Sequence, residues 1–145
     1  MIEITVPWAP SVNDYWRHVF RGKNAGRVYI SEGGKAYREA VRGIYLENRS
    51  LLRVPAGILR VEILAYVPDK RRRDLDNQLK AIFDAITYAG MWEDDSLVDD
   101  YRIRRARKPD GSLIIAGMHR ITITSACDAG ADISQPDVEK TSQIG

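Results

Sequence analysis

The sequence has almost no cysteine or histidine, and it has no long apolar run. Among its 145 residues are one cysteine, Cys127, and two histidines. A single cysteine excludes an intramolecular disulfide and a cysteine-rich zinc site, so we expect a reducing compartment, the cytoplasm. No segment approaches the roughly 18–20 apolar residues of a membrane span. Met1–Pro7 also lacks the basic and apolar regions of a signal peptide, so we expect no membrane partner.

The net charge of +2 conceals a difference between two parts of the chain. Residues 126–145 contain four acidic residues and one basic residue, which leaves 21 basic and 16 acidic residues in 1–125. This basic excess is mild support for a polyanionic partner. The sequence predicts a single domain over 1–125 and a flexible acidic tail over 126–145.

Apolar periodicity predicts the regular elements. Residues that alternate between apolar and polar predict strands at 2–6, 59–67, 98–107 and within 113–124. The last two strands flank a turn signal, Pro109-Asp110-Gly111, and we expect them to pair with each other.

Two segments have apolar residues at helical spacing. One helix is expected from a cap at Ser31 to about residue 48, and a second from residue 76 or 77 to 89, closed by Gly90. The order β-α-β-α-β-β predicts an α+β domain with a mixed four-stranded sheet and two main helices. Segment 8–29 has little regular pattern. We interpret it as a long loop whose aromatic residues either pack in the core or stack on exposed bases.

Carboxylates and basic residues are concentrated before and after the second helix. Lys70-Arg71-Arg72-Arg73 runs directly into Asp74 and Asp76, and Lys80 follows one helical turn after Asp76. The acidic segment Glu93-Asp94-Asp95 comes after the helix. Aspartates brought together repel one another, and a divalent cation removes that penalty. Mg²⁺ prefers such hard oxygen ligands, and it keeps coordination positions that substrate phosphate can occupy.

This pattern predicts a metal site made by Asp74, Asp76 and Asp95, with Lys80 facing the developing charge on phosphorus. The three arginines would hold flanking phosphates. Each feature also has a purely structural interpretation. Asp76 could only cap the helix or pair with Lys80, the arginines could be a solvated loop, and the acidic segment could be an ordinary loop.

The same segments resemble the RusA family, the Holliday-junction resolvases of bacteria and their prophages. The resemblance spans most of the chain, and its centre is Arg-Arg-Asp-Leu-Asp-Asn followed at a fixed distance by Trp-x-Asp-Asp. The matching segments are Val6–Asn13, Tyr15–His18, Ser31–Arg38, Pro68–Asn77 with Lys80, Phe83–Ala85, Ala89–Ser96 and Val98–Arg102.

The resemblance implies a homodimeric crossover junction endodeoxyribonuclease that acts in DNA recombination and repair. Such an enzyme binds four-way DNA and makes paired, symmetric nicks with Mg²⁺, for which Mn²⁺ or a similar ion substitutes. The family's essential carboxylates correspond to Asp74, Asp76 and Asp95, and its essential lysine corresponds to Lys80. Two alternatives stay open: a catalytically silent module that binds branched DNA, and a nuclease for flaps or forks. The roles of Glu93 and Asp94 also stay open.

Overall fold

The computed structural model describes residues 1–127 of the chain. The predicted tail at 126–145 therefore lies outside the described residues from residue 128 onward. Within the described part, no helix is both long enough and apolar enough to cross a membrane.

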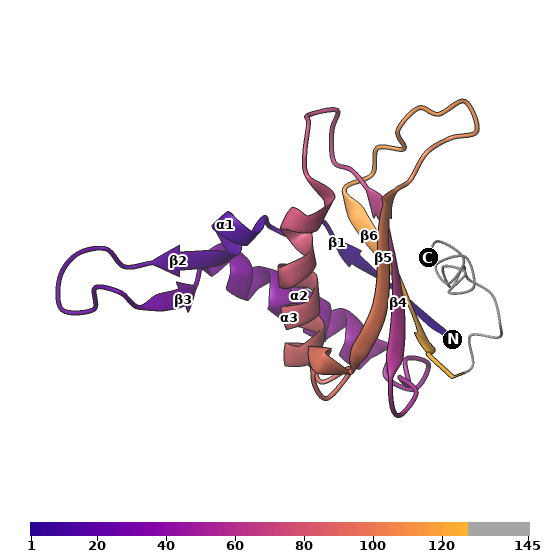
Figure 1. The fold of residues 1–145 in the computed structure, drawn as a ribbon, viewed down its shortest axis with the longest axis horizontal. Helices are drawn as coiled ribbons and strands as arrows, with labels where there is room; N and C mark the ends of the chain where they lie inside the picture. The colour runs from indigo at the N-terminus through magenta and orange to yellow at the C-terminus, as the bar shows by residue number, and fades with distance from the viewer. Residues whose placement is uncertain (128–145) are drawn as a thin grey trace, which may run out of the picture.

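A mixed four-stranded sheet forms the centre of the fold, in the order β1-β6-β4-β5 (Figure 1). The strands are β1 (Ile2–Pro7), β4 (Leu59–Tyr66), β5 (Val98–Arg105) and β6 (Met118–Ser125). β6 runs antiparallel to both of its neighbours, whereas β4 and β5 are parallel. The predicted α+β class with a mixed sheet and two main helices is confirmed.

The expected pairing of the last two strands with each other is wrong, because β4 lies between β5 and β6. The turn itself is present: the Lys108 amide donates to the Ser112 carbonyl at 2.8 Å. Beyond this turn the chain passes the end of β4, where the Ala116 amide donates to the Val67 carbonyl at 3.0 Å. Alternation of apolar residues is the same for adjacent and for separated strands, so it could not reveal this crossing.

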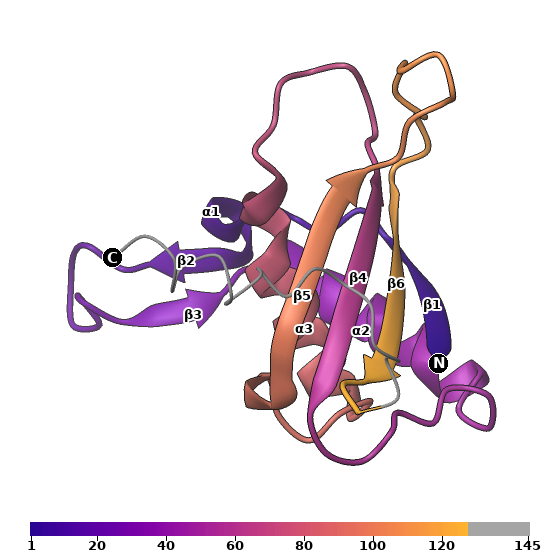
Figure 2. The same ribbon diagram turned by 45° about the vertical axis from the view of Figure 1, so that its right-hand side comes forward.

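Helices cover one face of the sheet and leave the other face in solvent (Figure 2). Along β4 every second residue is buried, and Leu59 and Ile63 are almost fully so. Ile63 lies opposite Ile121 of β6, which is equally buried. The open face is charged, as expected for a sheet with one covered face. The residues along it include Glu3, Glu62, Arg102, Arg104 and Arg120.

The two main helices begin and end close to where the sequence predicts. α2 (Glu32–Glu47) follows Ser31, whose hydroxyl accepts a hydrogen bond from the Gly34 amide at 3.0 Å. α3 (Leu79–Ala89) is preceded by the 3₁₀ turn η1 (Leu75–Gln78). α3 ends at Gly90, which has the left-handed φ of 78° that favours glycine.

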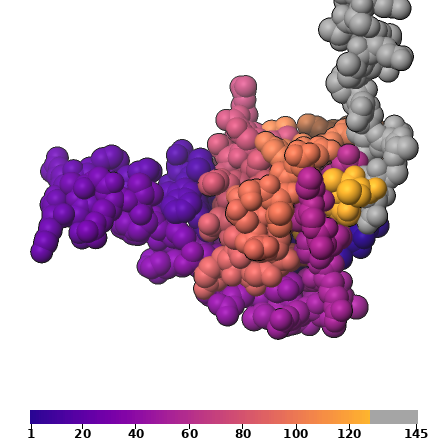
Figure 3. Space-filling model, turned by 60° about the horizontal axis from the view of Figure 1, so that its bottom comes forward, coloured from indigo at the N-terminus to yellow at the C-terminus, as the bar shows by residue number. Residues whose placement is uncertain are grey.

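The loop expected at 8–29 instead contains regular structure. A short helix α1 (Val12–Tyr15) leads into a two-stranded hairpin of β2 (Trp16–His18) and β3 (Val28–Ile30). Figures 1 and 3 show this hairpin projecting from the body of the molecule. Strands of three residues are too short to give a readable period-two pattern, so the sequence could not distinguish the hairpin from a loop.

Candidate active site

The turn that precedes α3 presents two carboxylates to solvent. Asp74 has extended backbone and stands at the start of η1, and Asp76 lies within that turn. Both residues are exposed, and neither carboxylate takes part in a hydrogen bond or ion pair among the contacts of residues 1–127. Gln78, not Asp76, occupies the N-cap position of α3, so the interpretation of Asp76 as only a helix cap is wrong.

An open cleft is lined by the first of these carboxylates, Asp74. Its lining combines cationic, carboxylate, amide and hydroxyl groups, the mixture that binds phosphate and a hydrated cation together. The lining residues are Ser11, Arg72, Arg73, Asp74, Asn77 and Gln78. Gln78 is 4% exposed, and α3 follows it directly, so the floor of the cleft is fixed by the helix.

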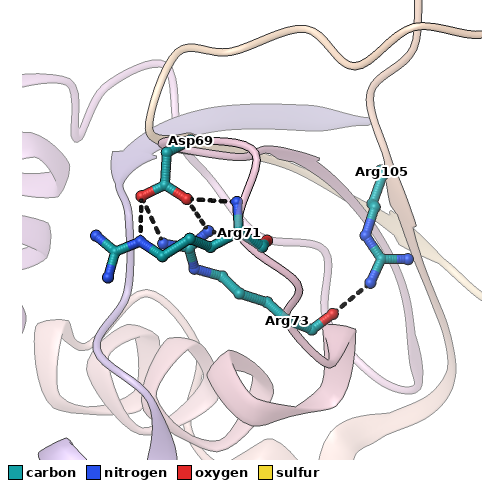
Figure 4. Close-up of polar contacts among 4 residues, drawn as sticks. All are labelled: Asp69, Arg71, Arg73 and Arg105. Atoms are coloured by element: carbon teal, nitrogen blue, oxygen red, sulfur yellow. Dashed lines mark hydrogen bonds and ion pairs between the residues drawn. The ribbon is translucent and has the colours of Figure 1, made fainter.

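Asp69 organises the basic segment in front of the carboxylates (Figure 4). Its two oxygens accept hydrogen bonds from the Arg73 guanidinium at 2.6 and 2.8 Å, and from the Arg71 amide at 2.8 Å. The hydrogen bonds from Arg73 and then from the Arg71 backbone hold the pKa of Asp69 well below its usual range. Asp69 therefore stays ionised and fixes the approach to Asp74.

A second contact ties this turn to the sheet. The guanidinium of Arg105, the last residue of β5, donates to the backbone carbonyl of Arg73. Arg73 also lies over the ring of Trp8, with its guanidinium carbon 6.0 Å from the ring centroid. Trp8 in turn stacks on His119, with ring centroids 4.3 Å apart. His119 is fully buried, and this burial lowers its pKa to about 4.

The predicted phosphate-binding arginines therefore differ from one another. Arg73 is bound to Asp69, and its side chain is only 22% exposed. Arg71 also contacts Asp69, at 3.2 Å, but its side chain is 83% exposed. Arg72 is exposed, lines the cleft and forms no ion pair among the described residues, so it has the most freedom to meet a ligand.

Lys80 lies in the first turn of α3 and is exposed. No ion pair between Lys80 and Asp76 occurs within residues 1–127, so the structure does not support the interpretation of these residues as a surface pair. Its ammonium group is therefore accessible to an anion from solvent.

The acidic turn that follows α3 is built differently. Trp92 is 4% exposed, and its indole N–H donates to the Thr87 hydroxyl at 2.6 Å. The Ser96 hydroxyl donates to Asp94 at 2.7 Å and lowers the pKa of that carboxyl. Asp95 begins the 3₁₀ turn η2 (Asp95–Leu97) and is partly exposed.

The structure does not bring Asp95 to Asp74 and Asp76 within one chain. η1 and η2 lie at opposite ends of α3, whose 11 residues span roughly 16 Å. β5 runs from η2 to Arg105 beside the first turn (Figure 2). In residues 1–127, no three His, Cys, Asp or Glu side chains are grouped to hold a metal ion. The expectation that one chain gathers the three carboxylates is therefore wrong, whereas their roles as ligands stay predictions.

Comparison with known proteins places the chain in a family. A family model described as endodeoxyribonuclease RusA matches residues 7–123. The chain belongs to the RusA family. The match covers the cleft and both acidic turns, so the RusA family resemblance seen in the sequence motifs is confirmed.

Several proteins named crossover junction endodeoxyribonuclease RusA are similar to this RusA family chain. One from Shigella sonnei (strain Ss046) is 49% identical over 100 residues, which cover 69% of this chain and 78% of that protein. One from Escherichia coli O139:H28 (strain E24377A / ETEC) is 43% identical over 125 residues, covering 86% and 95%. One from Enterobacteria phage 82 is 48% identical over 101 residues, covering 69% and 78%.

Sequence reasoning missed the residues that hold the site in place. Asp69, Arg105, Trp8 and His119 support the turn before α3, yet none was assigned a role there. The sequence did contain a signal for Asp69. An aspartate can accept hydrogen bonds from the backbone amide two residues later, here Arg71, and from an arginine side chain four residues later, here Arg73. The others come from distant parts of the chain and carry no such local signal.

Proposed function

We propose that this RusA family chain is a Mg²⁺-dependent endodeoxyribonuclease that resolves four-way DNA junctions by paired symmetric nicks, in cytoplasmic DNA recombination and repair. The observation that carries the proposal is the pair of exposed carboxylates in the turn before α3, Asp74 and Asp76, which lack protein partners among the described residues. Asp74 also lines a cleft that contains Arg72 and Arg73. Because no protein cation within residues 1–127 neutralises these two carboxylates, both remain free to bind a metal ion.

The donor set of the first turn fits a hard dication. Mg²⁺ is usually held by one or two carboxylates, with water and substrate phosphate completing the shell, and Asp74 and Asp76 supply that number. The bound ion would polarise a phosphodiester oxygen and lower the pKa of a bound water. Arg72 and Lys80 would hold the phosphate against these carboxylates and stabilise its developing negative charge.

A second copy of the chain offers the third carboxylate. Asp95 and Asp74 lie at opposite ends of α3 in one chain. A homodimer with two-fold symmetry is the simplest way to bring their carboxylates together. In such a dimer, Asp95 of the partner subunit would complete each site. The two sites would then be equivalent, as two matched cuts require.

The activity is tested with synthetic DNA. We expect wild-type protein with Mg²⁺ to make paired nicks in a four-way junction and to cut a fork or linear duplex far more slowly. Binding without cutting under Mg²⁺ or Mn²⁺ would instead favour a silent binding module. Preferential cutting of flaps or forks would favour the other alternative nuclease.

The metal assignment is tested with Asp76→Asn. We expect this variant to bind the junction as wild type does but to cut it about 1000-fold more slowly, the scale on which loss of charge stabilisation acts. Asp110→Asn is the matched control, since Asp110 lies in the turn before β6, where its carboxylate accepts a hydrogen bond from the Ser112 hydroxyl. Cutting by Asp76→Asn at the wild-type rate would overturn the metal assignment.

The shared site is tested by mixing two inactive chains. Asp76→Asn and Asp95→Asn chains carrying different tags are co-expressed, and the mixed dimer is isolated. If each site draws on both chains, one site of the mixed dimer keeps every carboxylate and nicks one strand of the junction. If each site lies within one chain, both sites of the mixed dimer are broken and no nicking is recovered.

A further inference from the structure

The β2–β3 hairpin and its loop, residues 16–30, carry positive charge only. This segment, called the arm below, contains no acidic residue. Its basic side chains are all exposed, and they are Arg17, His18, Arg21, Lys23 and Arg27. Figures 1 and 3 show the arm standing clear of the sheet and main helices. A projecting segment of this charge is suited to contact a polyanion.

The two faces of the arm differ in chemistry. Arg17 lies opposite Tyr29, and His18 lies opposite Val28, so these pairs point to different faces. The Val19 amide donates to the Arg27 carbonyl at 2.9 Å, which continues the ladder and places Arg27 on the face of Arg17. One face therefore presents two guanidinium groups with a tyrosine between them.

The opposite face ends in an exposed aromatic ring. Phe20 is 86% exposed, and its ring stacks against His18 with centroids 6.2 Å apart. Val28 on the same face is 52% exposed. Leaving a phenylalanine in water forgoes about 2 kcal/mol of burial, so its position does not serve the stability of the free chain.

The base of the arm is fixed to the body. Tyr15 is fully buried, and its hydroxyl donates to Asp84 of α3. The Ser31 amide returns to the Tyr15 carbonyl at 2.9 Å, so both ends of the arm are joined. A Cβ at Gly34 would lie 2.7 Å from the Ile30 side chain, which shows how closely α2 packs against this base. The exposed groups are therefore held out on a fixed support.

We propose that the arm enters the branch point of branched DNA, where its two faces meet different strands: Arg17 and Arg27 contact phosphates on one face, and Phe20 stacks on an exposed base on the other. This inference rests on the proposed function and adds a recognition element outside the cleavage site. Stacking on an aromatic ring contributes about 1–3 kcal/mol per base, and an unpaired base is the least costly to reach. A second copy of the chain is a poor binding partner for the arm, because symmetric contact between two arms would bring eight arginine and lysine side chains together.

The stacking role is tested with Phe20→Ala and Phe20→Trp. The probe is a four-way junction with 2-aminopurine at the branch point, and binding is measured without Mg²⁺ to prevent cutting. We expect Phe20→Ala to weaken junction binding about tenfold, to leave duplex binding unchanged and to reduce the fluorescence change of the probe. Phe20→Trp should retain wild-type binding.

Leu51→Ala is the matched control, since Leu51 is also an exposed apolar residue, at 77%, and lies outside the arm. Equal junction affinity for Phe20→Ala and Leu51→Ala would overturn the stacking role. A change in sedimentation of the free protein, without a change in junction binding, would assign the arm to contact between copies and would also overturn it.

The phosphate contacts are tested by salt dependence. Arg17→Ala/Arg27→Ala should lower the slope of log affinity against log salt by about two units, one for each lost contact. Arg49→Ala/Arg53→Ala, which removes two exposed arginines outside the arm, should leave the slope unchanged. Equal slopes for the two double variants would overturn the phosphate contacts.

Assays of the wild-type protein distinguish a failure of the proposed function from a failure of the proposal about the arm. If it neither binds nor cuts branched DNA, the proposed function fails. If it binds and cuts while the arm variants behave as their controls do, the inference about the arm fails alone.

Discussion

The two acidic turns that flank α3 are fixed by opposite means. The turn before α3 is held at the surface by the Asp69–Arg73 ion pair and by the guanidinium of Arg105. The turn after α3 is held from the core by the buried indole of Trp92. The first arrangement leaves two carboxylates open to a ligand. The second places Asp95 at the start of η2, three residues after a buried tryptophan. Two acidic segments at the ends of one helix are thus supported by different interactions, an ion pair at the surface and an aromatic side chain in the core.

The largest expected effect concerns the core support of the second turn. Trp92→Ala should lower the free energy of unfolding by about 4 kcal/mol, because it removes a buried indole and leaves a cavity beside Phe83. Urea denaturation measures this loss. Thr87→Val is the control: it keeps the packing but removes the acceptor of the indole N–H, so it should cost only about 1–3 kcal/mol. Equal losses for both variants would mean that the hydrogen bond, not the packing, holds this turn.

Acid should weaken the support of the first turn, which rests on Trp8 and the buried His119. The pKa of His119 is about 4 in the folded chain and about 6.5 when exposed. Between these values the unfolded chain takes up a proton that the folded chain does not. The contribution of His119 to the free energy of unfolding is therefore fully present above pH 6.5. It falls by roughly 3 kcal/mol as the pH is lowered to about 4.

Denaturation of wild type and His119→Phe across this pH range measures the effect. The variant keeps an aromatic ring against Trp8 but has no titrating group, so its stability should lack this component of the pH dependence. A wild-type profile identical to that of the variant would show that His119 does not link this support to pH.

A smaller effect is expected from releasing the surface ion pair of the first turn. Asp69→Asn should free the Arg73 guanidinium and lower the cleavage rate about tenfold, because Asp74 would lose its fixed approach to the phosphate. The fold should remain intact by circular dichroism. Asp110→Asn, in the turn before β6, removes the same charge far along the chain and should cut as wild type does. Equal rates for the two variants would show that Asp69 does not position the site.

The smallest expected effect is at the junction of α3 with the second turn. Gly90 has a φ of 78°, so Gly90→Ala should cost about 1 kcal/mol of stability. Gly43→Ala is the opposite control, since Gly43 is inside α2 and an added Cβ meets nothing within 4 Å. It should stabilise the chain by about 0.5–1 kcal/mol. Thermal denaturation of the two variants compares them, and a shift of the same sign would contradict this account.

The local features of the fold were predictable from the sequence. Ser31 as a helix cap, Gly90 as a helix end and the alternation along β4 each depend on a few neighbouring residues, and each is confirmed. The sequence also indicated Asp74 and Asp76 as candidate site residues next to the basic segment, and both are exposed at the turn before α3, although their use as metal ligands stays a prediction.

The long-range features were not predictable in the same way. The position of Asp95 depends on the full length of α3, which carries the chain away from η1, and β5 then returns it to the first turn at Arg105. The support of Arg73 by Trp8 and His119 depends on two residues that are 111 positions apart in the sequence. Neither relation leaves a pattern within a short window of residues.

The order of strands in the sheet means that the sheet can be completed only after β6 has been synthesised. β6 is made after every other strand, yet it sits in the interior of the sheet between β1 and β4. Until it leaves the ribosome, β1 and the β4–β5 pair have no partner between them, and their backbone groups and apolar faces stay open to other chains. A nascent chain that stalls before residue 118 therefore exposes the unpaired edges of β1 and β4, which can pair with other chains. Protection by chaperones matters most before β6 has been synthesised.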